Sequence, residues 1–254
     1  MSDKVTDAGR AAAGLFIGVA VVVATFLAAS AWERVKTRPP DRTIQVTGSA
    51  KKRIVSDQIV WTAEISTVAM DRTAAYHSLA GYVQTALAYL DAQGIRKDEI
   101  RASSTTVQEV RETEYVGVGA ERIQRQAFKG YRTSQGLAVR SGDVARVERV
   151  SREITQLLEQ GVPISSSEPS YFYTRIGELK IEMLAEAARD ARTRAESILE
   201  KAGGARITRL RAADMGVINI NPANSTATSW DGINDTTSLD KDVLTIVHVT
   251  FEVE

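Results

Sequence analysis

The sequence predicts an α+β fold: two strand-helix-strand-strand units with a connecting helix, preceded by one N-terminal transmembrane helix. Three observations lead to this prediction. Segments rich in Val, Ile and Thr with partial alternation are typical of strands, and apolar stripes at helical spacing that end at glycine are typical of helices. An uncharged apolar run also stands near the start of a chain that is 25% charged. The order strand, helix, strand, strand occurs over residues 54–140 and again over 164–254, which indicates a repeated unit.

Residues 11–32 form the apolar run, and we expect them to cross a membrane as a helix. At about 1.5 Å per residue, a helix of this length spans the ~30 Å hydrocarbon core of a bilayer, whereas a cleaved signal has an apolar core of roughly 7 to 15 residues. Trp32 and the basic residues after it suit the headgroup region. The alternative is a cleaved signal, for which Ala29-Ser30-Ala31 offers a small-x-small site.

The preferred interpretation divides the chain into four parts. These are a cytoplasmic leader at 1–10, a transmembrane anchor at 11–32, a spacer at 33–41 and a folded domain at 42–254. The spacer is more basic than the leader, which by the positive-inside rule favours a cytoplasmic location for the folded domain. Long domains translocate largely regardless of such charges, so the charges do not determine the orientation of the anchor. The chain contains no cysteine, which suits an oxidising compartment without requiring one.

The first predicted unit contains strands, a helix and a hairpin. A strand at Thr43 to Ala50 precedes this unit. The ranges of the unit are a strand at Ile54 to Met70, a helix from Asp71 or Thr73 to Gly94, and strands Glu99 to Tyr115 and Gln124 to Arg140. Gly48 and Lys51-Lys52-Arg53 are taken to mark the break between the first two strands, and an aspartate or threonine suits the helix N-cap. Gly117-Val118-Gly119 predicts the hairpin turn, since glycine readily adopts the positive φ that such turns need.

A connecting helix from Asp143 to Gly161 leads to the second unit. The predicted ranges of that unit are a strand at Ile164 to Thr174, a helix at about Glu178 to Ala202, and strands Arg206 to Ile220 and Val243 to Glu254. The long helix ends at Gly203-Gly204, and its inward stripe is rich in alanine, which lets it lie close on a sheet. The residues expected to face inward are Leu184, Ala187, Ala188, Ala191, Ala195, Ile198 and Ala202.

Composition and motifs argue against an enzyme and against a nucleic-acid partner. Lysine plus arginine equals aspartate plus glutamate at 32 each, so no global field attracts nucleic acid. His77 and His248 have no histidine or cysteine at ligand spacing, and we expect neither to be catalytic or metal-binding. Glu182 and Glu186 share a helix face, which basic neighbours mark as a solvated surface. We therefore expect no catalytic, cofactor-binding or metal-binding residue.

Two features stand above this background. Gly14 and Gly18 form a Gly-x-x-x-Gly pattern that permits close packing of the anchor against another helix. Trp230 lies in the polar segment "SWDGINDTTS", whose residues cannot bury it locally. It is therefore a candidate interaction residue, seated either in a pocket of its own domain or at a partner site.

The folded part also resembles a known family. "PSYFYT" at 169–174, "LKIEMLAEAARDARTRAESI" at 179–198 and "AADMGVINI" at 212–220 are similar to the bacterial SIMPL-domain family, which includes YggE and the Brucella periplasmic immunogenic protein, and in particular to its membrane-anchored branch. "FKGYRTSQGLAVRSGD" at 128–143 supports the resemblance. The family's Val-x-Gly-x-Gly and Pro-Ile-x-Pro-Gly patterns are replaced by Val46 to Ala50 and by Ser238 to Asp242.

The resemblance implies a single-pass protein of the bacterial inner membrane with its C-terminal domain in the periplasm. It also implies self-assembly into a homo-oligomer and a link of relatives to envelope or oxidative stress, and it implies no catalytic residue. The last strand also favours assembly if it lies at a sheet edge, where its backbone groups need a neighbour. The expected function is therefore a membrane-anchored, non-enzymatic assembly protein. The alternative is a periplasmic module that binds a ligand or peptide near Trp230.

Overall fold

A computed structural model describes residues 18–33, 42–117 and 122–254. Residues 18–33 are helical, in agreement with the later part of the predicted anchor. Residues 11–17 of that anchor, the leader and most of the spacer lie outside the described residues. Among the residues described, we find no helix that combines the length and the apolar character needed to cross a membrane.

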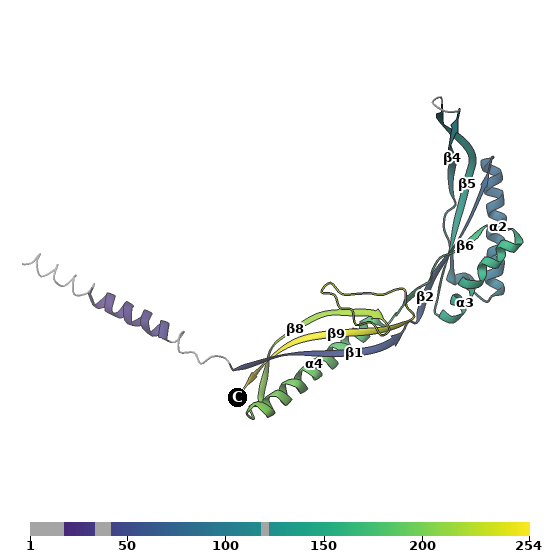
Figure 1. The fold of residues 1–254 in the computed structure, drawn as a ribbon. Coiled ribbons are helices and arrows are strands. Elements are labelled where there is room, and N and C mark those ends of the chain that lie inside the picture. Colours follow the sequence, from purple (N-terminus) through teal and green to yellow (C-terminus); the bar gives the residue numbers. More distant parts are fainter. Residues whose placement is uncertain (1–17, 34–41, 118–121) are drawn as a thin grey trace, which may run out of the picture.

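The domain from residue 42 onward has an α+β fold, as predicted. Its described strands form two sheets, and the domain is elongated with a bend between them (Figure 1). Its strands are β1 (Thr43–Val55), β2 (Gln58–Ala69), β3 (Ile100–Ala102), β4 (Thr106–Val116), β5 (Ile123–Ser141), β6 (Ile164–Ser166), β7 (Ser170–Phe172), β8 (Ile207–Pro222) and β9 (Asp240–Val253). Its helices are α2 (Arg72–Ala92), η1 (Lys97–Glu99), α3 (Val144–Glu153), η3 (Ile154–Gln160) and α4 (Ile176–Ala202).

One sheet joins the first and last strands of the domain, in the order β1-β9-β8. β1 is continuous, so the break predicted at Gly48 and Lys51-Lys52-Arg53 is wrong. Gly48 pairs with Val247 of β9, and the three basic residues pair with Leu244, Val243 and Asp242. The chain turns instead at Ser56-Asp57, between β1 and β2. The final strand is central, with an antiparallel neighbour on each side, and the edges of the sheet are β1 and β8.

Helix α4 lies on one face of this sheet, mainly over β1 and β9. Its fully buried residues are Leu179, Met183, Ala187, Ala191 and Ala195. The predicted alanine stripe is therefore correct at its centre and wrong at its margins, since Ala188 and Ala202 are exposed and Ile198 is 50% exposed. Residues four positions apart lie in one row along the helix, and this row contacts the sheet. The apolar pattern of the sequence also includes residues beside that row, which lie outside the contact.

The close approach of α4 depends on Gly48 of β1. A Cβ atom added to Gly48 would overlap the Ala187 carbonyl oxygen and lie 2.7 Å from the Ala191 Cβ. Next to it, the Ser49 backbone N–H donates to the Asp190 carboxylate at 2.8 Å, and Arg194 donates to the same carboxylate oxygen at 2.8 Å. The bond from Ser49 is the main reason that the pKa of Asp190 is lowered, with Arg194 contributing. Asp190 therefore ties helix to strand.

We expect Asp190→Ala to lower the free energy of unfolding by about 1–2 kcal/mol, because it removes a charge-assisted bond to the backbone of β1 as well as a helix-surface ion pair. The matched control is Glu196→Ala, which removes only the exposed pair with Arg192 and should change the free energy by less than ~0.5 kcal/mol. Urea unfolding of both variants makes the comparison. Equal effects of the two substitutions would show that the Ser49 bond contributes nothing.

The other sheet has the order β3-β5-β2-β6, with β4 also on β5 and β7 also on β2. Helices α2 and α3 pack on this sheet. The buried residues of the core between the sheet and its helices include Trp61, Leu79, Leu90, Leu137 and Ile154. Asp71 and Asp143 cap the two helices as predicted, each accepting from the backbone N–H three residues on. The single strand predicted over residues 164–174 is instead two short strands, β6 and β7, which both pair with β2.

The strands of the two sheets differ from those of the two predicted units. β2, α2 and β5 belong to the first unit as expected, but the single strand predicted from Glu99 to Tyr115 is divided into β3 and β4, which both pair with β5. In the second unit, α4, β8 and β9 are completed by β1 rather than by residues 164–174. β1, the first strand of the domain, therefore lies in the same sheet as the last two strands. The connection between β1 and β2 passes from this sheet to the other.

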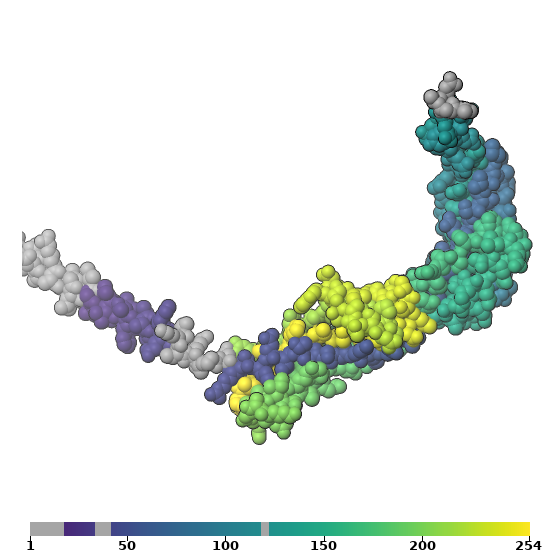
Figure 2. Space-filling model, in the orientation of Figure 1, coloured from purple at the N-terminus to yellow at the C-terminus, as the bar shows by residue number. Residues whose placement is uncertain are grey.

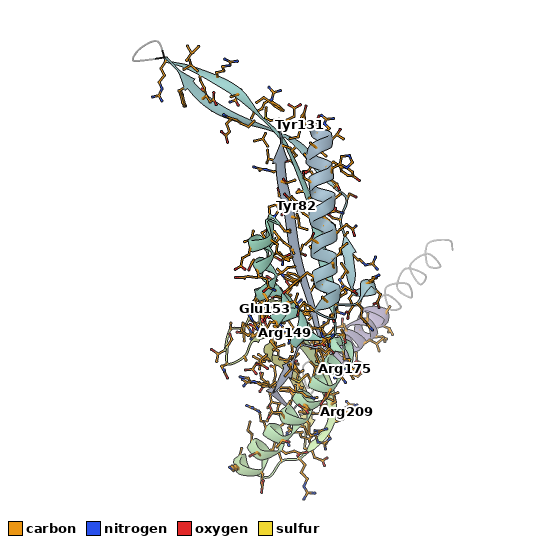
Figure 3. The ribbon with its side chains drawn as sticks, turned by 90° about the vertical axis from the view of Figure 1, so that its right-hand side faces the viewer. Tyr82, Tyr131, Arg149, Glu153, Arg175 and Arg209 are labelled. Carbon is orange, nitrogen blue, oxygen red and sulfur yellow. The ribbon has the colours of Figure 1, made fainter. Side chains whose placement is uncertain are left out.

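β4 and the first half of β5 form a two-stranded ribbon that extends past the end of α2 (Figure 1). The predicted hairpin is confirmed, although its turn residues Val118 and Gly119 lie outside the described residues. Tyr131 lies where the ribbon leaves α2 (Figure 3), and the Arg72 guanidinium sits 4.8 Å from the centre of its ring. Ten of the eleven β4 residues are exposed, so the ribbon forms a narrow projection (Figure 2).

Candidate functional site

The connection between β8 and β9, residues 223–239, is held against both sheets, and we call it the strap. The Ile220 N–H of β8 donates to the Ile233 carbonyl at 2.7 Å, and the Asp235 N–H donates to the Ile220 carbonyl at 2.9 Å. On the other side, the Tyr171 N–H of β7 donates to the Thr236 carbonyl at 2.7 Å. The strap therefore bridges the end of one sheet and a short strand of the other.

A cavity of about 400 Å³ lies beneath the strap. It is lined by β7 and the start of α4, by the end of β8, by the strap and by the start of β9. Its residues are Tyr171, Phe172, Tyr173, Ile176, Lys180, Ile218, Ile220, Asp231, Gly232, Ile233, Asn234, Asp235, Thr236 and Lys241. Its size is within the usual range of small-ligand pockets, and its lining combines aliphatic and aromatic groups with a few polar ones, as such pockets do.

A buried ion pair holds the strap over this cavity. The Lys241 Nζ donates to the Asp235 carbonyl at 2.6 Å and to its carboxylate at 3.2 Å, and the two side chains are 2% and 6% exposed. Burial by itself would raise the pKa of Asp235, but hydrogen bonds from Thr237, Lys241 and Ser238 outweigh it and lower the pKa from 3.8 to about 2. Asp235 is therefore ionised, and its negative charge balances the positive charge of Lys241 where this side chain lines the cavity.

A second carboxylate secures the start of the strap. Asp242, whose side chain is 2% exposed, accepts from Arg53 Nε at 2.9 Å and from the Asn224 N–H at 2.8 Å, and it pairs with Lys51 at 3.1 Å. The bond from Arg53 is the largest reason that the pKa of Asp242 lies well below its usual range, followed by the bond from Asn224. The strap is therefore attached at both ends by ionised aspartates.

The structure places the predicted interaction residue on this strap. Trp230 is 92% exposed and is not among the residues that line the cavity, so its indole is presented to solvent. A partner site at Trp230 stays a prediction. Gly14 lies outside the described residues, and Gly18 begins the described part of the first helix, where an added Cβ would meet nothing within 4 Å, so a packing role for this pair also stays a prediction.

The titratable residues considered in the sequence lie apart from the cavity. His77 is exposed on α2 with its ring against Tyr76, and the His248 Nδ1 lies 3.0 Å from the Thr47 hydroxyl on the β1–β9 pair. Glu182 is bonded to Lys52 of β1. Within the described ranges, no cluster of three or more His, Cys, Asp and Glu residues has the arrangement of a metal site. The expectation that the chain is not an enzyme stays a prediction.

Asp235, Lys241 and Asp242 were not among the residues predicted from the sequence. One signal for them exists: Asp235-Thr236-Thr237 has the composition of a turn in which an aspartate accepts from the backbone two residues on, and the Asp235 carboxylate accepts from the Thr237 N–H at 3.0 Å. No local sequence pattern predicts the ion pair between Lys241 and Asp235, because a lysine in a charged segment normally lies in solvent.

A scan against family models then decides the relationship of the chain. The model described as "SIMPL: Protein of unknown function (DUF541)" matches residues 44–242. The chain belongs to the SIMPL family. The match begins in β1 and ends at the third residue of β9, so it includes the β3-β5-β2-β6 sheet, the strap and the residues that line the cavity of this SIMPL domain. A comparison with curated proteins yields no match.

Proposed function

We propose that this SIMPL-family chain is a non-enzymatic protein of the bacterial inner membrane, anchored by residues 11–32, whose periplasmic domain assembles into homo-oligomers. The observation that carries the proposal is the β4–β5 ribbon. An isolated two-stranded ribbon is marginally stable in water, and this one exposes several apolar side chains. They are Val107 at 43%, Tyr115 at 58%, Val116 at 49%, Ile123 at 63% and Phe128 at 39% exposure.

The edge strand β8 supports the same proposal. The last strand does not offer the edge considered in the sequence, because β9 is central. β8 takes that place: residues 208–217 are exposed, among them Leu210 at 58% and Met215 at 67%. Helix α4 lies mainly over β1 and β9, so it leaves this part of β8, which carries Leu210 and Met215 together with Arg209, Arg211 and Asp214, largely uncovered. An edge strand with exposed apolar side chains is a typical site for pairing with another subunit.

The membrane anchor and the periplasmic location rest on the apolar run and on the resemblance to the membrane-anchored branch of the family. Residues 18–33 are helical, as an anchor requires. Confinement to a membrane surface raises the effective concentration of subunits, so weak contacts between ribbons and edges suffice for assembly. A role in envelope or oxidative stress rests on the family resemblance alone.

Light scattering on the full-length protein, extracted from membranes with a mild detergent, tests the proposal. We expect a mass several times that of the 27.6 kDa chain. Val116 and Ile123 are cross-strand partners on the ribbon, so Val116→Lys with Ile123→Lys should shift the assembly to monomers. The matched control places two lysines at exposed apolar positions elsewhere, Tyr76→Lys with Ile181→Lys, and should leave the mass unchanged.

A wild-type protein that is monomeric at tens of micromolar, both in detergent and as a chain beginning at Arg42, would contradict self-assembly. Release of the full-length protein from membranes by high salt without detergent would contradict the anchor. These two outcomes are independent, so one part of the proposal can fail without the other.

The cavity beneath the strap supports a second candidate function, a periplasmic module that binds a ligand or peptide. Its volume of about 400 Å³ and its position next to the strap that carries Trp230 favour this alternative. The two functions use different surfaces and are compatible in one molecule.

A further inference from the structure

One wall of the cavity presents an unpaired backbone segment of the strap. Asn234 bridges to Ile220 in parallel fashion, and the two hydrogen bonds of this bridge use the Ile233 carbonyl and the Asp235 N–H. In a parallel bridge of this kind, the N–H and C=O of the central residue point to the opposite side. The backbone N–H and C=O of Asn234 are therefore directed away from β8, and neither has a hydrogen-bond partner among the described residues.

The wall formed by β7 presents a similar segment. The Tyr171 N–H donates to the strap at Thr236, whereas the Phe172 carbonyl accepts from the Asp57 N–H on the opposite side. Because backbone groups alternate along an extended chain, those of Tyr173 are directed to the same side as those of Tyr171. The Tyr173 N–H and C=O have no partner in the part of the chain that the structure describes.

These two segments meet at one end and separate at the other. The Tyr171–Thr236 hydrogen bond closes the end of the cavity, and beyond it the walls carry Tyr173 and Asn234 without a bond between them. The space between them is the cavity, which Ile176, Ile218 and Ile233 line with aliphatic groups. Its buried cation, Lys241, is already neutralised by Asp235, so the cavity offers no unbalanced buried charge to an ionic ligand.

We propose that this cavity binds a short, uncharged, extended peptide segment by strand addition. The main chain of the peptide donates to and accepts from the free backbone groups of Tyr173 and Asn234, and an apolar side chain lies among the three isoleucines. Backbone pairing supplies the affinity and the aliphatic lining supplies the preference, as in other cases of strand addition. This inference rests on the second candidate function and names its ligand class.

The test uses full-length protein and calorimetric titration with acetylated tetrapeptide amides that carry Ala, Val, Leu or Phe at the second position. We expect saturable binding that is strongest for an apolar side chain larger than alanine. The same peptides with N-methylated amides at the second and third positions keep their side chains but lose two donors. Their affinity should fall by about tenfold or more, since each lost hydrogen bond weakens binding severalfold.

A variant locates the site. Ile233→Lys places a charge in the lining, and it should abolish binding, whereas Ile198→Lys on the remote part of α4 should not. Circular dichroism checks that both variants fold. The absence of saturable binding to the wild type at millimolar peptide, or unchanged binding to Ile233→Lys, would overturn the proposal. Equal affinity for N-methylated peptides would overturn backbone recognition while leaving a ligand site, and the oligomer mass, measured separately, reports on self-assembly.

Discussion

Gly48→Ala is expected to lower the free energy of unfolding by at least about 2 kcal/mol, although it adds only one methyl group. The added Cβ would overlap the Ala187 carbonyl oxygen and lie 2.6 Å from the Ala191 backbone nitrogen. Both are backbone atoms of α4, so no side-chain rotation can relieve the contact. The helix must move away from the sheet, which disturbs the buried layer formed by Ala187 and Ala191 and the hydrogen bond between Ser49 and Asp190.

The matched control is Gly81→Ala on α2, where an added Cβ meets nothing within 4 Å. This substitution should raise the free energy of unfolding by about 0.5–1 kcal/mol, because alanine loses less backbone entropy than glycine in a helix. Urea unfolding monitored by circular dichroism measures both changes. If Gly48→Ala proves as mild as Gly81→Ala, the close contact between α4 and β1 is wrong.

The second large effect is expected for Lys241→Met, which keeps most of the side-chain volume and removes the charge. The Asp235 carboxylate, 6% exposed, would lose its buried cation, and breaking a buried pair from one side typically costs about 3–5 kcal/mol. We expect the unfolding midpoint to fall accordingly and the strap to loosen from β8. Lys180→Met is the control, because Lys180 lines the same cavity but is exposed.

The pH dependence gives this prediction a distinct signature. The pKa of Asp235 is about 2 in the folded protein against a reference of 3.8, so the folded state favours the ionised form. The corresponding stability, up to about 2 kcal/mol, is present above pH 4 and is lost as the pH falls from about 4 to about 2. In Lys241→Met the pKa of Asp235 rises towards its reference value, so the stability lost between about pH 4 and about pH 2 should become smaller than in the wild type. Identical pH profiles for the wild type and Lys241→Met would contradict the role of this pair.

Several local features could be predicted from the sequence because they depend on residues close together in the chain. Asp71 and Asp143 cap helices by bonding to backbone groups three residues on, and Gly161 ends η3 at a positive φ of 78°. The β4–β5 hairpin follows from two strand-forming segments around a glycine turn. The same local patterns carried the family resemblance, which the match over residues 44–242 confirms for the SIMPL family.

The candidate site could not be predicted in this way. Trp230 marks the polar loop in the sequence, but the cavity is built by residues such as Tyr173 and Ile218, and Trp230 does not line it. An aspartate and a lysine in a charged segment carry no sign of burial. Only the packing of β7, β8 and the strap around them makes Asp235 and Lys241 a buried pair.

The α+β class, the N-caps of α2 and α3, the hairpin and the centre of the alanine face of α4 follow from the amino-acid order alone, since each depends on backbone geometry and spacing within a few turns of chain. The pairing of strands across long distances follows only from the folded domain. Thr43 lies opposite Glu252, so β1 completes the late unit, β9 becomes central, and β8 is left as the exposed edge. Strand alternation specifies which face of a strand is buried but not which neighbour satisfies its backbone groups, and that choice is made by packing over the whole domain.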